Sequence, residues 1–324
     1  LVYLSAHQKL EEFIIHMIAT VYKSTGSWYN VKSESGRFFN ARMKGVLKID
    51  DITSTNPVAV GDKVNIEIEN ETEGTAIINE ILPRHNYINR QSPRFKHQHH
   101  IVAANLDQSI LVATLKEPKT SQGFIDRFLV ACEMYHVSAF IVFNKSDLYK
   151  TKELEKYEQW KTMYETVGYK VLLVSADKNE GIEQLNSILN NKISLLSGHS
   201  GVGKSSLLNV LMPGMNRKVQ DVSGWSGKGQ HTTTFAEMFD LPGGGSIIDT
   251  PGMREFGLVD IEKSELSHYF PEMRDRLNGC QFNNCMHINE PDCAIKQAVR
   301  QGEIFEDRYV SYVNILESIE EGKW

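Results

Sequence analysis

The sequence predicts a multi-domain α/β protein with an N-terminal OB-fold β-barrel, a central parallel α/β domain and a C-terminal helical domain. Three observations predict this order. Short strands of alternating polarity come first, a strand, a glycine loop and a helix follow one another around Gly198–Ser206, and three cysteines gather between Cys280 and Cys293. Strands that alternate with helices indicate a mostly parallel sheet covered by helices.

Length and composition limit the class of protein. A chain of 324 residues has room for two or three domains, and 41% hydrophobic with 23% charged residues is ordinary for a globular protein. No apolar run approaches the roughly 20 residues of a membrane span, so we expect no integral membrane protein and no membrane partner. A formal net charge of −6 argues against indiscriminate nucleic-acid binding and leaves room for a local basic face.

Residues 18–82 have the sequence pattern of a small β-barrel. Gly, Pro, Asn and Asp breakers separate short alternating runs, which is typical of a small closed barrel. The runs are Ile18–Tyr22, Trp28–Val31, Arg37–Arg42, Lys63–Ile68 and Gly74–Leu82.

Aromatic and basic side chains are mixed along these runs. This mixture fits two interpretations equally: a nucleic-acid-binding face, or a barrel with aromatic core residues and solvated charges. The residues concerned are Tyr22, Trp28, Tyr29, Lys32, Arg37, Arg42 and Lys44.

Two segments flank the barrel. Residues 1–17 are expected to be an extension, either an amphipathic helix or a non-native addition with a natural start at Met17. Residues 83–100 are polar and basic, and we interpret them as a linker or RNA-contacting segment.

The central domain is expected over residues 101–258. Its strand-like runs are Gln108–Thr114, Ser138–Phe143, Val171–Ser175, Ile193–Ser197, Phe235–Leu241 and Ser246–Asp249, and its helical runs are Gly123–Tyr135, Lys152–Val167 and Ile182–Asn191.

Gly198–Ser205 matches the P-loop pattern G-x-x-x-x-G-K-[ST] between a strand and a helix. Its glycines bring backbone N–H groups close to phosphates, and the helix N-terminus favours negative charge. Lys204 is expected to reach the β- and γ-phosphates and stabilise charge during hydrolysis, and Ser205 to bind Mg²⁺. The predicted nucleotide-binding residues here are Gly198, Ser200, Gly201, Val202, Gly203, Lys204, Ser205 and Ser206.

Asn144-Lys145-Ser146-Asp147 follows an apolar strand and predicts the choice of base. The Asp147 carboxylate can accept two hydrogen bonds from guanine N1–H and N2–H₂, a pair that adenine does not offer. Asn144 is expected to brace the loop and the Lys145 stem to lie against the base. Ser175 and Ala176 follow the next strand and fit the loop that contacts guanine O6.

Asp249-Thr250-Pro251-Gly252 also ends a strand. Asp249 is expected to hold Mg²⁺ through water, and the Gly252 N–H to meet the γ-phosphate. One of Thr232, Thr233 and Thr234 is the expected switch threonine that binds Mg²⁺.

The usual GTPase order places the P-loop first and the base-specificity loops last. Here the base loops precede Gly198–Ser205, and Asp249–Gly252 comes last. The sequence therefore predicts a circularly permuted P-loop GTPase domain, in which the second switch leads directly into the next domain.

That next domain, residues 259–324, is expected to be helical and zinc-binding. Cys280, Cys285, His287 and Cys293 follow the spacing C-x4-C-x-H-x5-C, and three thiolates with one imidazole suit one tetrahedral structural Zn²⁺. The alternative is free cysteines with a surface histidine. Such cysteine use favours a reducing, cytoplasmic compartment, and helices are expected at Lys263–Met273 and Glu303–Glu321.

The P-loop, the permuted order, the preceding barrel and the Cys-Cys-His-Cys cluster together resemble the RsgA (YjeQ) family of bacterial ribosome-assembly GTPases, from about Met17 to the end. The resemblance implies a GTP- and GDP-binding hydrolase that acts late in maturation of the small (30S) ribosomal subunit. It implies hydrolysis stimulated by that subunit, through contacts with 16S rRNA and ribosomal proteins. It also implies Mg²⁺ with GTP and one Zn²⁺, and we expect a monomer.

The resemblance maps the family's first switch onto His231–Thr234 and favours Thr233 as the Mg²⁺ ligand. Met253 stands where Ras-like GTPases carry a water-orienting glutamine, and a thioether cannot orient water by hydrogen bonds. His231 is the candidate to complete the site, and the alternative is a histidine that only folds the switch. Two other functions stay open: an RNA-binding assembly module that uses GTP as an occupancy switch, and a regulatory GTPase without RNA contact.

Overall fold

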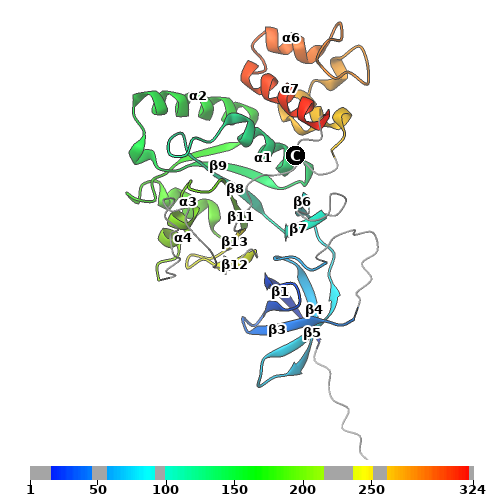
Figure 1. Cartoon of the computed structure of the whole chain (residues 1–324), viewed down its shortest axis with the longest axis vertical. Coiled ribbons are helices and arrows are strands. Elements are labelled where there is room, and N and C mark those ends of the chain that lie inside the picture. The colour runs from blue at the N-terminus through cyan, green and yellow to red at the C-terminus, as the bar shows by residue number, and fades with distance from the viewer. Residues whose placement is uncertain (1–15, 46–56, 92–98, 215–235, 251–260, 321–324) are drawn as a thin grey trace, which may run out of the picture.

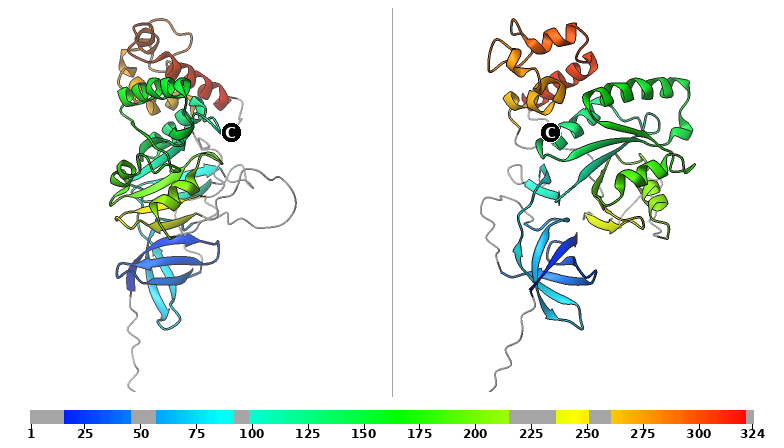
Figure 2. Two further views of the ribbon diagram at one scale, coloured as in Figure 1. Left: turned by 90° about the vertical axis from the view of Figure 1, so that its left-hand side faces the viewer. Right: turned by 180° about the vertical axis from the view of Figure 1, so that it is seen from behind.

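The computed structural model describes residues 16–45, 57–91, 99–214, 236–250 and 261–320. A small barrel, an α/β domain and a helical domain follow one another along the long axis of the molecule (Figures 1 and 2). Within the described residues, no helix is both long and apolar enough to cross a bilayer.

The N-terminal domain is a closed five-stranded barrel. Its strands are β1 (His16–Ser24), β2 (Tyr29–Ser33), β3 (Phe38–Met43), β4 (Lys63–Asn70) and β5 (Thr75–Ile81). They pair in the order β1-β2-β3-β5-β4, and β4 closes the barrel on β1. The pairing confirms the predicted OB-type barrel. Strand β1 begins two residues before the predicted boundary, because His16 and Met17 already pair with β4.

The barrel interior follows the alternation of the strands. Val21, Val31, Phe39 and Ile66 are at most 2% exposed, as period-two burial requires. Tyr29, placed by the sequence among exposed-looking aromatic residues, is 1% exposed and belongs to this core. The exposed-face interpretation was therefore wrong for Tyr29.

The segment predicted as a linker contains a β-hairpin of β6 (Tyr87–Gln91) and β7 (His99–Ala104). It is joined tightly to the barrel, because both Arg84 nitrogens Nε and Nη2 donate to the Asp62 carboxylate at 2.6 Å, and this pair is buried. The backbone of Gly61 lies so close to the end of β7 that an added Cβ would lie 2.0 Å from the Ala104 carbonyl oxygen. The described part of this segment is thus ordered against the barrel.

The central sheet has the order β10-β9-β8-β11-β13-β12. All pairs are parallel except β12 with β13. The strands are β8 (Gln108–Ala113), β9 (Ser138–Phe143), β10 (Lys170–Leu173), β11 (Ile193–Ser197), β12 (Glu237–Asp240) and β13 (Ser246–Asp249).

Helices cover both faces of this sheet (Figure 1). Helices α1 (Gln122–Met134) and α2 (Thr151–Val167) pack into one apolar core, and α3 (Ile182–Leu189) and α4 (Lys204–Leu211) into a second. Buried β8 runs through the middle and contributes to both cores, as a two-sided parallel sheet requires. The carboxyl ends of the strands therefore meet at one edge, where the loops come together.

The C-terminal domain consists of short helical elements. They are the 3₁₀ helices η2 (Lys263–Tyr269) and η3 (Leu277–Gly279), and the α-helices α5 (Pro271–Arg274), α6 (Ala294–Arg300) and α7 (Glu306–Glu320). The predicted continuous helix Lys263–Met273 is broken, because Pro271 lacks an N–H and starts a new helix at its first turn. Helix α7 packs on α1, so this domain shares a core with the α/β domain.

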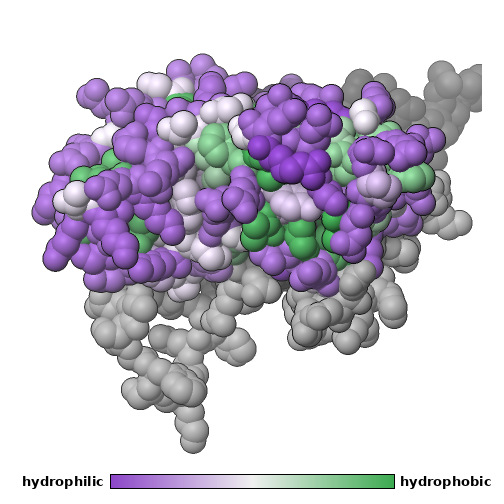
Figure 3. Space-filling model, turned by 90° about the horizontal axis from the view of Figure 1, so that it is seen from above, coloured by the Kyte–Doolittle hydropathy of each residue, from purple (hydrophilic) through white to green (hydrophobic). Residues whose placement is uncertain are grey.

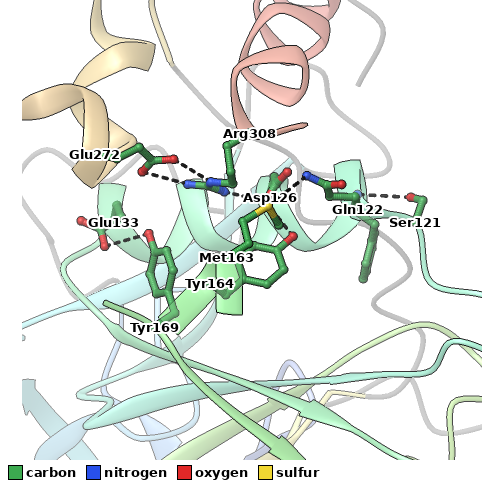
Figure 4. Close-up of polar contacts among 10 residues, drawn as sticks. Ser121, Gln122, Asp126, Glu133, Met163, Tyr164, Tyr169, Glu272 and Arg308 are labelled. Atoms are coloured by element: carbon green, nitrogen blue, oxygen red, sulfur yellow. Dashed lines mark hydrogen bonds and ion pairs between the residues drawn. The ribbon is translucent and has the colours of Figure 1, made fainter. Parts of the chain in front are cut away.

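A buried ion cluster fixes that contact (Figure 4). Arg308 of α7 is fully buried and donates to Asp126 of α1 and, at 2.7 Å from Nε, to Glu272 of α5. The Tyr164 hydroxyl donates to the same Asp126 oxygen at 3.0 Å. Seen from this end, the molecule is mostly hydrophilic with smaller hydrophobic areas (Figure 3).

Candidate nucleotide and metal sites

The loop between β11 and α4 requires glycine at two positions. Gly198 has φ +139°, and an added Cβ would lie 2.3 Å from the Val112 carbonyl oxygen. Gly203 has φ +94°, and its Cβ would lie 2.3 Å from Asn144 Nδ2. The glycines therefore bring this loop against β8 and against Asn144, and leave its N–H groups at the start of α4.

Lys204 lies at the first position of α4. Its ammonium donates to the carbonyl of Gly198 and, at 2.8 Å, to that of His199. Burial lowers the pKa of Lys204, and the charge of Asp249 opposes this shift. The structure thus brings together the lysine, the loop and the end of β13.

Asn144 joins two loops that are far apart in sequence. It follows β9 and is 1% exposed. Its Nδ2 donates to the Val202 carbonyl of the P-loop at 2.9 Å, and its Oδ1 accepts from the Ala176 N–H at 3.1 Å. Asn144 therefore has the bracing position that the sequence predicts for it.

Asp147 lies in a 3₁₀ turn, η1 (Ser146–Leu148), beside the same loop. The buried Ser175 hydroxyl donates to Asp147 Oδ1 at 2.5 Å and accepts from the Lys178 N–H at 3.1 Å. This bond fixes one carboxylate oxygen and so limits rotation of the carboxylate. Lys145 has φ +64° and its ammonium donates to the Glu117 carbonyl at 2.5 Å.

Asp249 ends β13 and is 9% exposed. The next residue, Thr250, is 7% exposed, and its hydroxyl has no hydrogen-bond partner among the described residues. The sequence did not single out Thr250. His231, Thr233 and Gly252 lie outside the described residues, so their roles stay predictions.

The sequence also missed an aromatic contact of the P-loop. The His199 ring stacks on Phe124 of α1, with ring centroids 3.6 Å apart and an interplanar angle of 28°. No local pattern marks this pair, because the two residues meet only when α1 packs on β8, the neighbour of β11 in the sheet.

The four predicted metal ligands form one cluster. The ligand atoms of Cys280, Cys285, His287 and Cys293 all lie within 4.8 Å of one another. His287 Nδ1 is 3.6 Å from Cys280 Sγ and 3.4 Å from Cys293 Sγ. Ligands about 2.0–2.3 Å from a tetrahedral Zn²⁺ are separated by roughly 3.5–3.8 Å, so the donor set fits this ion.

Surrounding residues hold the loops of this cluster in place. The Tyr309 hydroxyl donates to the His287 carbonyl at 2.6 Å, and the Tyr312 hydroxyl donates to that of Met286 at 3.0 Å. The Glu290 carboxylate accepts from the N–H groups of Met286 and Ile288 at 2.7 and 2.9 Å. The sequence did not identify this shell, although the helical spacing of the two tyrosines places them on one face of α7.

Two protein-family models match this chain. The family model for the RsgA GTPase matches residues 81–259, and the model for the RsgA N-terminal domain matches residues 19–76. A protein of Bacteroides fragilis (strain YCH46), named small ribosomal subunit biogenesis GTPase RsgA, is 48% identical over 308 residues, covering 95% of this chain and 99% of that protein. A protein of the same name from Cytophaga hutchinsonii is 51% identical over 300 residues, covering 93% and 98%.

Two solved structures are similar over their whole length. YjeQ from Thermotoga maritima superimposes with a TM-score of 0.77 at 35% identity and covers 94% of this chain and 98% of that one. YloQ, described as a circularly permuted GTPase, superimposes with a TM-score of 0.73 at 29% identity and covers 98% and 99%. The permuted order predicted from the motifs agrees with this likeness.

Proposed function

Because this chain belongs to the RsgA GTPase family, we propose that it binds GTP at Gly198–Ser205 and hydrolyses it during maturation of the small ribosomal subunit. One observation carries the nucleotide assignment: Asn144 bonds both Val202 of the P-loop and Ala176 of the base loop. A phosphate-binding loop and a base-binding loop are thereby held at a fixed separation.

Guanine is selected at Asp147. Its carboxylate accepts hydrogen bonds from guanine N1–H and N2–H₂, while Ser175 holds one of its oxygens. The loop of Ser175 and Ala176 contacts guanine O6, and the Lys145 stem covers one face of the base. Adenine offers no such pair of N–H donors, so both hydrogen bonds from the base to the carboxylate are lost.

Hydrolysis is attack of water on the γ-phosphorus, which breaks its bond to the β–γ bridging oxygen and releases GDP and phosphate. Lys204 stabilises the negative charge that develops on the phosphate oxygens, and the Gly252 N–H adds a hydrogen bond there. Ser205, Thr233 and Asp249 would hold Mg²⁺, and the ion would supply positive charge that stabilises the phosphate charge during hydrolysis. His231 orients the attacking water, because Met253 has no hydrogen-bonding group that could do so.

The relatives named for small ribosomal subunit biogenesis support the choice of partner. The barrel offers a suitable contact face, since Trp28 and Phe38 are 48% and 46% exposed and the side chain of Arg37, next to Phe38 in the chain, is 45% exposed. The cytoplasmic location and the monomeric state remain predictions. The cysteine and histidine cluster binds one structural Zn²⁺ that fixes the fold of the third domain.

Phosphate release under multiple turnover tests the enzymatic claim. The full chain with excess GTP, Mg²⁺ and small subunits is expected to release many phosphates per protein, and little with ATP. The variant His231→Ala is expected to bind GTP normally and lose the stimulated turnover. Tight GTP binding without repeated phosphate release would contradict hydrolysis and favour an occupancy switch.

A further inference from the structure

The barrel and the nucleotide domain are joined through the edge of the central sheet. Lys23 of β1 is the Cα partner of Glu237 in β12, and Glu237 is the Cα partner of Asp249 in β13. Two strand spacings of about 4.8 Å each therefore separate the backbone of Lys23 from that of Asp249. In Figure 1, β12 lies on the side of the α/β domain that faces the barrel.

Side chains reinforce this backbone contact. Lys23 Nζ lies 3.2 Å from Glu237 Oε1. The Tyr22 hydroxyl donates to Asp240 Oδ1 at 2.6 Å, and Lys32 Nζ donates to Asp240 Oδ2 at 2.5 Å. We call these five residues the hairpin clamp: Tyr22, Lys23 and Lys32 of the barrel, with Glu237 and Asp240 of β12.

The clamp is ordered by several bonds and yet remains accessible to water. Burial acts to raise the pKa of Asp240, but hydrogen bonds from Lys32, Tyr22 and Ser246 outweigh burial, so the pKa lies below its ordinary value. Lys23 and Glu237 are each about one-third exposed. An open pocket of about 620 Å³ lies beside this contact, lined by the barrel and β12, and all the clamp residues except Lys32 contribute to its lining. The contact is therefore polar and not closely packed.

The barrel has a very different attachment at the Asp62–Arg84 pair. That pair is buried, and the Asn105 side chain donates to the Gly61 carbonyl at 3.0 Å in the same contact. A buried, multiply bonded attachment of this kind resists movement, whereas solvated ion pairs exchange readily with water. The clamp is thus the contact that can change when the barrel meets a partner.

We propose that the hairpin clamp makes the barrel a positioning element for the magnesium site, because it fixes the β12–β13 hairpin whose last residue is Asp249. The inference rests on the proposed role of Asp249 in binding Mg²⁺. Strand β12 would otherwise be a free edge, and it is only four residues long. The P-loop and Asn144–Asp147 follow the interior strands β11 and β9, and neither strand pairs with β12, so these two loops do not depend on the clamp.

The test compares full-length variants that remove only clamp contacts. Tyr22→Phe with Lys23→Met and Lys32→Met breaks the clamp from the barrel side. The matched control is Arg42→Met, which breaks an ion pair with Glu69 on the same barrel, away from β12. Two quantities are measured without ribosomes: the Mg²⁺ concentration for half-maximal GTP turnover, and the affinity for GDP in excess EDTA.

The triple variant is expected to need about five-fold more Mg²⁺ and to bind GDP in EDTA within about two-fold of the parent. Arg42→Met is expected to match the parent in both measurements. Lys23→Glu is expected to shift the Mg²⁺ midpoint, and the swap Lys23→Glu with Glu237→Lys to restore it, because the ion pair reforms with reversed sign.

An unchanged Mg²⁺ midpoint in the folded triple variant would overturn the inference. A loss of GDP affinity in EDTA as large as the shift in the Mg²⁺ midpoint would also overturn it, since the substitutions would then weaken nucleotide binding in general. Failure of the proposed function gives a different result: the parent chain would show no Mg²⁺-dependent GTP turnover, or Asp249→Asn would leave its Mg²⁺ midpoint unchanged.

Discussion

At the scale of single residues, the site depends on hydrogen bonds that orient charged groups. Ser175 holds Asp147, and Asn144 holds the P-loop against the base loop. The motifs that contain these residues are contiguous, so the sequence predicts them and their order along the chain. Their partners come from other loops, and the sequence does not show those pairings.

Asp147→Ala is expected to lower GTP affinity about 100-fold and to leave weak ATP binding unchanged, because two hydrogen bonds between guanine and a carboxylate are lost. Ser175→Ala is expected to have a smaller effect, about five-fold, since it frees the carboxylate without removing it. Competition against a fluorescent guanine nucleotide measures both. Equal loss of GTP and ATP binding would contradict the role of Asp147.

Gly203→Ala is expected to abolish nucleotide binding. The new Cβ would lie 2.3 Å from Asn144 Nδ2, and a positive φ strains any other residue. Gly123→Ala is the matched control, because a Cβ there would meet nothing within 4 Å. The same competition assay should show loss for the first variant and parental affinity for the second; binding by both would argue against the close contact.

At the scale of elements, the sequence predicts most strands and helices to within a few residues. It does so because period-two alternation and glycine breakers are local signals. The predicted helix Lys263–Met273 and the linker over 83–100 differ from the structure, since Pro271 and the barrel contact decide the conformation there. Arg308 and Asp126 are 182 positions apart, and no local pattern reveals such a pair.

Arg308→Met is expected to lower the free energy of unfolding by about 3–5 kcal/mol, because it leaves Asp126 and Glu272 buried without their partner. Arg274→Met is the control, since its ion pair with Glu133 is partly exposed and is expected to be worth less than about 1 kcal/mol. Urea unfolding monitored by circular dichroism measures the difference. Similar midpoints for the two variants would contradict the structural role of Arg308.

Cys293→Ser is expected to lose the bound metal and to expose α6 and α7 to protease, because the ion would join the Cys280–His287 loop to Cys293 at the start of α6. Cys132→Ser provides the control, since Cys132 is buried in α1 outside the cluster. Native mass spectrometry should find one Zn²⁺ in the parent and in Cys132→Ser, and none in Cys293→Ser. Retention of the metal by Cys293→Ser would remove Cys293 from the ligand set.

At the scale of the whole molecule, the barrel and the third domain both connect to elements of the nucleotide domain. The barrel pairs with β12, and β13 leads through residues 251–260 into the third domain. That domain returns to the α/β domain through the buried Arg308 contact with α1. A partner that touches the barrel or the third domain therefore acts on elements adjoining the predicted phosphate and magnesium sites.

The central claim is a GTP hydrolase that responds to the small ribosomal subunit, and steady-state turnover tests it most directly. Phosphate release is measured for the full chain alone, with purified small subunits and with large subunits, using GTP and ATP. We expect slow release alone and strong stimulation by small subunits with GTP only. GTP turnover that is the same with small subunits, with large subunits and with neither would contradict the account.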